Sequence, residues 1–367
     1  MKIECVQEKL AGAVSIAERV AGKHVTLPVL SCLLLDAQKN QLTIRATNLD
    51  LGLEIIVPAK TDEEGIVAVP ANILSSFISG ASQGDKGVKI FTKDANIVVE
   101  ASHSRGTIKT MPVDDFPSIP RVSDGTSFTV NGADFVKGLK SVWYSASISG
   151  IKPELSSVYI YSDDGTVVFA ATDSFRLAEK RIRLKKSADF TQILIPFKNI
   201  PEIIRVFDQV NDDISVTLSK NQISFDYKGL YLVSRVIDGV FPDYKQIIPK
   251  QSTTEVVVLK QDLIDGLKVS HIFSDKFNQI TMVVDPKTKE FSLKTKNADV
   301  GENTHNLEAT IEGDAITINF NYKYITDCFQ SIDSDSITLL FNGLNRPMVM
   351  HPATDKSFTY LVMPMNR

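Results

Sequence analysis

The chain repeats one pattern three times at an interval close to the length of a domain. Met111-Pro112, near the end of the first third, recurs as Met363-Pro364 near the C-terminus, and Val236-Ile237 takes the same place between them. Self-similarity at a fixed interval indicates repeated structural units, and an interval of about one third of the chain is long enough for each unit to have its own core. The sequence therefore predicts three similar domains, at 1–122, 123–250 and 251–367.

Each third begins with a short strand that leads into a helix. The apolar anchors of these helices start at Leu10, Phe135 and Leu263, and each is followed by a second apolar residue four positions later. This spacing places both residues on one face of a helix. About halfway along each third a second strand leads into a second helix, so we expect six helices. The residues expected to cap the second helices are Asn72, Asn199 and Asn321.

Most of the remaining segments are typical of short strands. Segments such as 41–47, 166–172 and 336–341 are rich in Val, Ile, Thr and Phe, and are separated by Asn, Asp, Gly and Lys turn residues. Strands that follow one another through short turns pair antiparallel. The fold class is therefore predicted to be α+β, with antiparallel sheets as an outer layer and the helices gathered on the other face.

Composition limits the compartment and the cysteine chemistry. With 43% hydrophobic and 23% charged residues, the chain is typical of a globular protein. No stretch approaches the roughly 18 apolar residues of a membrane helix, and the N-terminus has no signal-like apolar core, so we expect a cytoplasmic protein with no membrane partner. Cys5, Cys32 and Cys328 are widely spaced, which predicts buried free thiols rather than a disulfide framework or a zinc site.

Motifs for catalysis are absent from the sequence. There is no phosphate-binding G-x-x-x-x-G-K-[ST], no H-E-x-x-H and no G-x-S-x-G, and the five histidines are isolated. The Asp-rich pieces at 162–165 and 211–213 are explained by turn chemistry. We therefore expect no catalytic residue, no metal and no cofactor.

One segment, 171–181, combines polar and apolar side chains densely. It is typical of a strand with a tight turn, and it also suggests a recognition groove in which Arg176 is flanked by Phe175 and Leu177. An enzyme of another class, a hydrolase centred on Ser174, remains an alternative. That alternative requires a histidine within hydrogen-bond reach of Ser174.

Several of these residues resemble a known family. The runs TLPVL (26–30), TDSFRLA (172–178), FPDY (241–244) and TYLVMPMNR (359–367) resemble the bacterial β sliding clamp, the processivity subunit of DNA polymerase III. The resemblance covers the whole chain. It implies a non-catalytic homodimer, closed head to tail into a ring around double-stranded DNA, with helices lining the hole and sheets forming the rim.

A clamp that slides needs a diffuse positive lining that acts on phosphates rather than base contacts. This requirement reconciles DNA binding with a net charge of −4. Candidate lining residues on or beside the helices are Lys9, Arg19, Lys23, Lys137, Lys140, Lys198, Arg205, Lys260, Lys268 and Lys323. By resemblance, the residues that contact DNA are Lys23, His24, Lys152 and Lys198.

The resemblance also implies a pocket for short peptides, often of the Gln-Leu-x-Leu-Phe type. These peptides come from the replicative polymerase, the clamp loader, other polymerases and repair proteins. The matching positions are Leu155, Thr172, Phe175, Arg176, Leu177, Pro242, Arg346, Pro347, Val362, Met363, Pro364 and Met365. Methionine and leucine suit such a role because they form an adaptable apolar surface.

The dimer interface is the third implied surface. The resemblance places Ile272 and Phe273 against Ile108 of the neighbouring subunit, and Arg105 against Asp299 and Glu302. An exposed apolar pair at 272–273 would mark an interface. A peptide-binding scaffold that never encloses DNA remains the other alternative.

Overall fold

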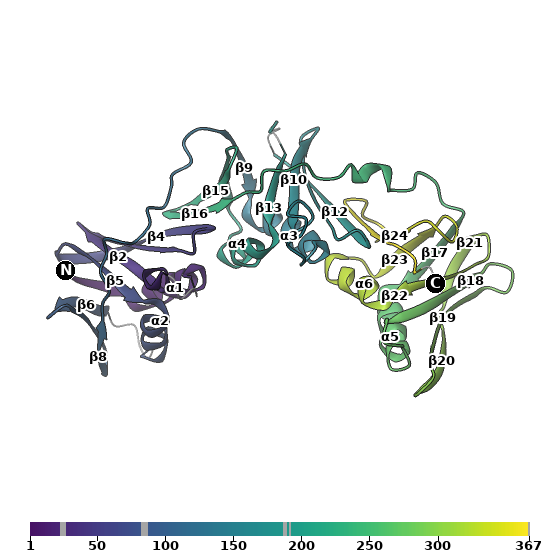
Figure 1. Ribbon diagram of the computed structural model, residues 1–367, viewed down its shortest axis with the longest axis horizontal. Helices are drawn as coiled ribbons and strands as arrows, with labels where there is room; N and C mark the ends of the chain where they lie inside the picture. Colours follow the sequence, from purple (N-terminus) through teal and green to yellow (C-terminus); the bar gives the residue numbers. More distant parts are fainter. Residues whose placement is uncertain (23–26, 82–86, 186–188, 191, 366–367) are drawn as a thin grey trace. The chain divides into compact units, whose positions relative to one another are not determined.

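The computed structural model describes residues 1–22, 27–81, 87–185, 189–190 and 192–365. The chain divides into two compact units, Met1–Val136 with Lys198–Asp238, and Lys137–Phe197 with Gly239–Arg367. Each unit is built from the same kind of element, a strand that leads directly into a helix. Figure 1 shows the course of the chain and labels most of these elements.

The first repeat runs from the N-terminus to residue 109. Its two strand-helix pairs are β1 (Lys2–Val6) with α1 (Gln7–Val20), and β5 (Gly65–Pro70) with α2 (Ala71–Gly80). The other strands are β2 (Cys32–Gln38), β3 (Gln41–Thr47), β4 (Leu51–Glu63), β6 (Gly87–Lys93), β7 (Asn96–Ala101) and β8 (Ser104–Lys109). A short 3-10 helix, η1 (Pro28–Ser31), precedes β2.

The second repeat follows the same order. Its strand-helix pairs are β9 (Thr126–Asn131) with α3 (Gly132–Val142), and β13 (Ile193–Pro196) with α4 (Ile200–Phe207). The other strands are β10 (Ser157–Asp163), β11 (Thr166–Thr172), β12 (Arg176–Arg183), β14 (Asp213–Leu218), β15 (Gln222–Tyr227) and β16 (Leu230–Arg235). The 3-10 helices are η2 (Trp143–Ser145) and η3 (Phe197–Asn199).

The third repeat contains β17 (Thr254–Leu259) with α5 (Lys260–His271), and β22 (Ile316–Asn321) with α6 (Tyr322–Asp327). The other strands are β18 (Gln279–Asp285), β19 (Glu290–Asn297), β20 (Gly301–Asn306), β21 (Ala309–Gly313), β23 (Ser336–Phe341), β24 (Met348–Pro352) and β25 (Phe358–Val362). The 3-10 helices are η4 (Tyr244–Gln246), before the repeat, and η5 (Cys328–Ser331). The six predicted helices are all present.

The helices lie on one face of the sheets because each has one apolar side. The anchors Leu10, Phe135 and Leu263 and the residues four positions later are all buried to 1% exposure or less, as the helical spacing predicts. Helix α1 packs on α2 and on β3 and β4, and α5 packs on α6 and β19. Figure 1 shows α1 beside α2 and α5 beside α6.

Two of the three predicted N-cap residues stand at an N-cap, and one of these two caps its helix with its side chain. Asn321 caps α6, since its side chain accepts from the Lys323 amide at 3.0 Å. Asn199 is at the N-cap of α4, but its amide group donates to the Ser234 hydroxyl instead. Asn72 lies inside α2, which begins one residue earlier, so the prediction was wrong there. Pro70 stands at that N-cap with no capping side chain.

The strand order is the same in all three repeats. Four strands pair as β5-β2-β3-β4, β13-β10-β11-β12 and β22-β18-β19-β20, and four more as β8-β7-β6-β1, β16-β15-β14-β9 and β25-β24-β23-β17. The repeats are then joined by strand pairing, β4 with β16 and β12 with β25. One sheet of the second repeat is therefore continuous with a sheet of the first repeat, and its other sheet is continuous with a sheet of the third. The boundary between the two compact units runs through the second repeat for this reason.

We expect Gly138→Ala in α3 to lower the free energy of unfolding, because an added Cβ would lie 2.5 Å from the ring of buried Phe169. Overpacking of this kind costs about 1–3 kcal/mol. The matched control is Gly12→Ala in α1, where nothing lies within 4 Å of the added atom. There the change should raise the free energy of unfolding by about 0.5–1 kcal/mol. Urea unfolding measures both values, and equal responses would contradict the close contact at Gly138.

Candidate functional site

The segment 172–177 forms a tight turn between β11 and β12 that its own side chains hold in place. Thr172 Oγ1 donates to the Arg176 carbonyl at 2.7 Å and accepts from the Ser174 amide at 3.1 Å. Asp173 Oδ1 accepts from the amides of Phe175 and Arg176, at 2.9 and 3.0 Å. Ser174 has a φ of 78°, which a non-glycine residue seldom adopts. The turn directs Phe175 outward, so that 59% of it is exposed.

The Arg176 side chain is largely buried and is held by contacts with three other side chains. Its Nε donates to Asp173 Oδ2 at 2.9 Å, its Nη1 donates to Asp327, and its guanidinium lies 4.9 Å from the centroid of the Tyr324 ring. Burial alone would lower the pKa of Arg176, but Tyr360, Asp327 and Asp173 together raise it above its usual value. Arg176 therefore stays charged, and part of its donor capacity is already used before any ligand arrives.

An aromatic group extends the exposed side of the turn. The Phe175 ring stacks on the Tyr324 ring from α6, with centroids 6.3 Å apart and planes at 17°. The hydroxyl of buried Tyr360 donates to the Tyr324 carbonyl at 2.7 Å, which fixes α6 against β25. Neither Tyr324 nor Asp327 was among the predicted site residues. Nothing in the sequence near the turn indicates them, because both come from α6 in the third repeat.

The end of β25 lies alongside the turn. Strand pairing sets Arg176 opposite Val362, and the Met363 amide then donates to the Phe175 carbonyl at 2.8 Å. Met363, Pro364 and Met365 are half-buried, and the Met365 amide donates to the Asn319 carbonyl. The structure thus brings together the predicted residues from β11, β12 and β25.

Five of the predicted pocket residues lie beneath the surface, namely Pro347 and four others. Leu155, Thr172, Leu177 and Val362 are all less than 9% exposed, and Val362 is fully buried. Thr172 pairs with Leu177 across β11 and β12. These four residues belong to the buried interior rather than to the exposed surface.

The remaining three predicted residues lie on connecting segments. Pro242 is exposed, Arg346 is exposed and Pro347 is buried. Within the described residues, no hydrogen bond, ion pair or ring contact joins them to the turn. The segment that carries Pro242 is anchored beside it, where Phe241 stacks on Tyr159 with centroids 4.7 Å apart.

Tyr244 anchors the same segment to the sheet. Its hydroxyl donates to the carboxylate of buried Glu179 and lies 2.9 Å from the Tyr161 hydroxyl. Burial, followed by the charge of Glu179, raises the pKa of Tyr244 far above its usual value. Sequence reasoning did not find this contact, since a buried glutamate and a tyrosine 65 residues apart carry no shared motif.

The basic residues predicted to line a DNA channel are partly neutralised within the chain. Lys198 is 60% exposed, and its Nζ lies 2.5 Å from Asp50 Oδ2. Lys137 lies 2.5 Å from Asp333, whose pKa it lowers by hydrogen bonding. Other internal partners are Glu202 for Arg205, Asp265 for Lys268 and the Ile332 carbonyl for Lys260.

Other basic candidates are exposed. Lys152 lies in the exposed segment before β10, and Lys9, Arg19 and Lys323 are exposed on α1 and α6. Lys140 is exposed on α3. Lys23 and His24 lie outside the described residues.

The residues predicted to form the dimer interface lie on or beside two edge strands. Arg105 is exposed on β8, with Glu100 of its own chain 3.3 Å away, and Glu302 is exposed on β20, 3.8 Å from Lys296. Asp299 is exposed in the turn before β20. Beyond α5, Ile272 is 64% exposed and Phe273 is half-buried. Ile108, by contrast, is 6% exposed and packs into its own domain.

The described residues show no metal-binding cluster and no histidine partner for Ser174. They include no group of three or more His, Cys, Asp or Glu side chains that could hold a metal ion. No described histidine hydrogen-bonds Ser174. The three cysteines are buried, as predicted, and burial raises the pKa of Cys5 to about 12. None of the described helices combines the length and the apolarity that a bilayer crossing needs.

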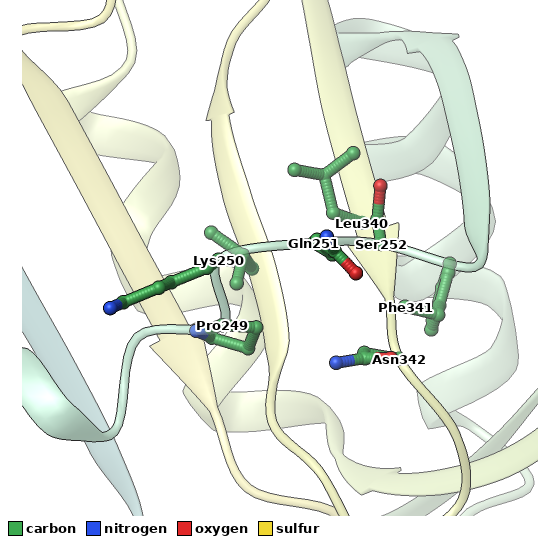
Figure 2. A pocket seen from close by; sticks show the side chains of 8 residues that line it. Pro249, Lys250, Gln251, Ser252, Leu340, Phe341 and Asn342 are labelled. Atoms are coloured by element: carbon green, nitrogen blue, oxygen red, sulfur yellow. The ribbon is translucent and has the colours of Figure 1, made fainter.

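Figure 2 shows a small cavity of about 140 Å³ near the ends of β23 and β24. It is lined by Pro249–Ser252, Leu340–Asn342 and Val349, and the Lys250 side chain extends away from the rest. None of the predicted site residues lines it.

Three repeated α+β domains that join sheet to sheet, with an exposed turn at each junction, are typical of the DNA-clamp class. Family comparison agrees over nearly the whole length. The DNA polymerase III beta subunit models match here as the N-terminal domain at 1–120, the central domain at 129–243 and the C-terminal domain at 245–366. The chain belongs to the DNA polymerase III beta subunit family.

Relatives and solved structures give the same result. The beta sliding clamp of Synechocystis is 30% identical over all of this chain and 99% of its own length, and that of Synechococcus elongatus is 26% identical with the same coverage. The Thermotoga maritima beta subunit has the same fold, with a TM-score of 0.94 at 24% identity over 100% of this chain and 99% of that one.

A Pseudomonas aeruginosa sliding clamp bound to griselimycin also has a TM-score of 0.94, at 24% identity over the whole of both chains. The chain is thus a beta sliding clamp, a non-catalytic processivity subunit, and its family implies DNA and DNA polymerase as partners. This function rules out the hydrolase centred on Ser174.

Proposed function

We propose that two copies of this chain associate head to tail and close into a ring around double-stranded DNA. The observation that carries the proposal is the repeated strand order. In the first repeat β4 pairs with β16 of the second, and in the second repeat β12 pairs with β25 of the third. The equivalent strand of the third repeat, β20, ends its sheet, and the equivalent partner strand, β8, ends another.

Two edges of matching type are thus left open at opposite ends of the repeat series. Edge strands have unpaired backbone donors and acceptors that favour pairing with another chain. A single junction that is used head to tail generates a closed ring when the rotation between copies permits it. The repeat therefore supports pairing of β20 with β8 of a second copy.

Charge and apolar surface at the two edges support the same pairing. Arg105 on β8 is opposite in sign to Glu302 on β20 and to Asp299 beside it. Ile272, 64% exposed, supplies apolar surface at the third repeat. Because Ile108 is buried in its own domain, we assign the first repeat's contribution mainly to the backbone edge of β8 and to Arg105.

The DNA contacts are proposed to be few and individually weak. Lys152 and Lys198, together with Lys23 and His24, would act on phosphates, and the exposed helix cations would add a diffuse positive field. Several of these cations already have acidic partners in the chain, which weakens each single contact. Weak contacts suit a ring that must slide, since enclosure rather than affinity keeps it on DNA. Because bacterial replication takes place there, we propose the cytoplasm as the compartment.

The surface of Phe175, Tyr324 and Met363–Met365 is proposed to bind short peptides of the Gln-Leu-x-Leu-Phe type. Exposed aromatic and methionine side chains give an apolar surface that adapts to different sequences. The neighbouring Arg176 remains charged and can orient polar groups of the peptide. The partners would be the replicative polymerase, the clamp loader, other polymerases and repair proteins.

Reversing one charge at the proposed interface should weaken the dimer. We expect Arg105→Glu to raise the dimer dissociation constant about tenfold, because it places a carboxylate near Glu302 and Asp299. The double variant with Glu302→Arg should recover most of the loss. Sedimentation equilibrium at two salt concentrations measures the constants, and a single variant that dimerises like the parent chain would contradict the proposed pairing of β8 with β20.

Enclosure of DNA predicts dependence on DNA topology. After loading by a clamp loader with ATP, the chain should remain with nicked circular DNA during gel filtration in high salt, and should be lost when the circle is cut once. Salt removes phosphate contacts but leaves a threaded ring in place. Equal retention on circular and cut DNA would favour direct binding. No retention on either would favour the scaffold that never encloses DNA.

Peptide binding should depend on the exposed aromatic group at the turn. We expect Phe175→Ala to weaken binding of a fluorescent Gln-Leu-Ala-Leu-Phe peptide at least tenfold, because the change removes the ring that stacks on Tyr324. The matched control is Phe277→Ala, since Phe277 is 57% exposed and lies elsewhere on the third repeat. Fluorescence polarisation measures both, and equal effects of the two changes would contradict the assignment.

A further inference from the structure

We propose that the junction between the first and second repeats is a second peptide-binding site, an internal copy of the surface at 172–177. The inference rests on the proposed function in one respect, because it takes the class of occupant, a short extended peptide, from that surface. The rest is carried by residues of the junction, all of which lie in the first compact unit.

The turn between β3 and β4 repeats the turn at 172–177 bond for bond. Thr47 Oγ1 donates to the Leu51 carbonyl at 2.7 Å and accepts from the Leu49 amide at 3.1 Å. Asn48 Oδ1 accepts from the amides of Asp50 and Leu51, at 3.0 and 2.7 Å. The side chains therefore fix this turn in the same geometry.

The copy includes the same unusual backbone conformation. Leu49 has a φ of 75°, and Ser174 at the equivalent position has a φ of 78°. This region is unfavourable for a leucine, and such strained residues are concentrated at functional positions. Here it directs an apolar side chain outward, and Leu49 is 46% exposed.

The strand β16 and the connecting segment, which lie opposite the turn at this junction, also have equivalents at the other junction. Leu51 pairs with Ser234 on β16, as Arg176 pairs with Val362 on β25, and both partners correspond when the repeats are aligned. Pro117 on the connecting segment corresponds to Pro242. That segment is fixed against β16, because the Tyr231 hydroxyl donates to the Pro120 carbonyl at 3.0 Å.

These walls enclose a pocket of about 260 Å³. Among its lining residues are Leu49, Asp50, Pro117, Pro120, Val233 and Arg235. An apolar cavity of about 150 Å³ already accommodates a benzene ring. The pocket can therefore take a leucine or phenylalanine side chain together with part of the peptide backbone.

The charges of the pocket select the occupant. Asp50, where Phe175 stands in the other turn, is paired with Lys198 at 2.5 Å. Arg235 is exposed, and no carboxylate in the described part of the chain lies within ion-pairing distance of it. One cation is thus available next to apolar walls, so the occupant that fits is a peptide in which a bulky apolar residue is followed by an acidic one.

The test is a titration of the full-length chain with a fluorescent Ala-Leu-Phe-Glu-Glu peptide, by calorimetry and by polarisation. Leu49→Asn and Arg235→Gln remove the apolar contact and the cation of the proposed pocket. Asparagine tolerates positive φ, so Leu49→Asn should keep the turn folded. Phe175→Ala removes the other surface, and none of the three changes lies on β8 or β20.

We expect two peptides per chain in the parent, and one in either junction variant with at least a tenfold loss of affinity for the missing site. Phe175→Ala should remove only the other peptide. A single site lost in Phe175→Ala and unaffected by the junction changes would overturn this inference and leave the proposed function intact. Loss of binding only in the junction variants would support the junction site and show that this peptide does not bind at 172–177. Unchanged affinity for a peptide with glutamine in place of both glutamates would overturn the role of Arg235.

Discussion

Strand pairing across the domain boundaries is the interaction on which the rest of the structure depends. A strand at the edge of a sheet has a row of backbone donors and acceptors that must find partners. In this chain β4 and β12 find them on the last strand of the following repeat. Because the pairing fixes the register of the two strands, it also fixes the position of the segments that adjoin them. The turn at 172–177, which precedes β12, therefore lies beside the segment that follows β25.

The helix pattern could be predicted from the sequence because it is local. The anchors at Leu10, Phe135 and Leu263 are buried where the spacing of apolar residues placed them, and six strand-helix pairs follow from the repeat. Capping was harder to predict, since Asn72 satisfies the composition rule for an N-cap while α2 begins before it. The preceding Pro70 already fixes the entry to that helix.

The edge strand β20 could not be predicted from the sequence. Strand β20, Gly301–Asn306, has no buried residue in any position, so it lacks the apolar alternation by which strands are recognised. It exists because β19 supplies its backbone partners. The residues of the peptide surface were likewise predicted only in part, since Phe175 and Met363–Met365 were expected and Tyr324 was not. Tyr324 reaches Phe175 through the pairing of β12 with β25, two strands from different repeats, which no local pattern encodes.

The repeat also shows how the connecting segments are held, and this bears on where a ring would open. Arg121 on the first connection pairs with Glu54 on β4, and Tyr244 on the second donates a hydrogen bond to Glu179 on β12. The two glutamates occupy equivalent positions of the repeat. Both intramolecular junctions thus combine strand pairing, a covalent connection and an anchor on that connection. A covalent connection gives the paired strands a high effective concentration, in the millimolar range for short linkers.

The proposed junction between β20 and β8 of a second copy has neither the connection nor the anchor. Its backbone pairing is of the same kind, but its association depends on the concentration of free chain. The ring would therefore part at this junction before either intramolecular one, without any weakening of its hydrogen bonds. A loader that opens the ring needs to act only there, and the two turns at 47–52 and 172–177 keep their geometry while it does so.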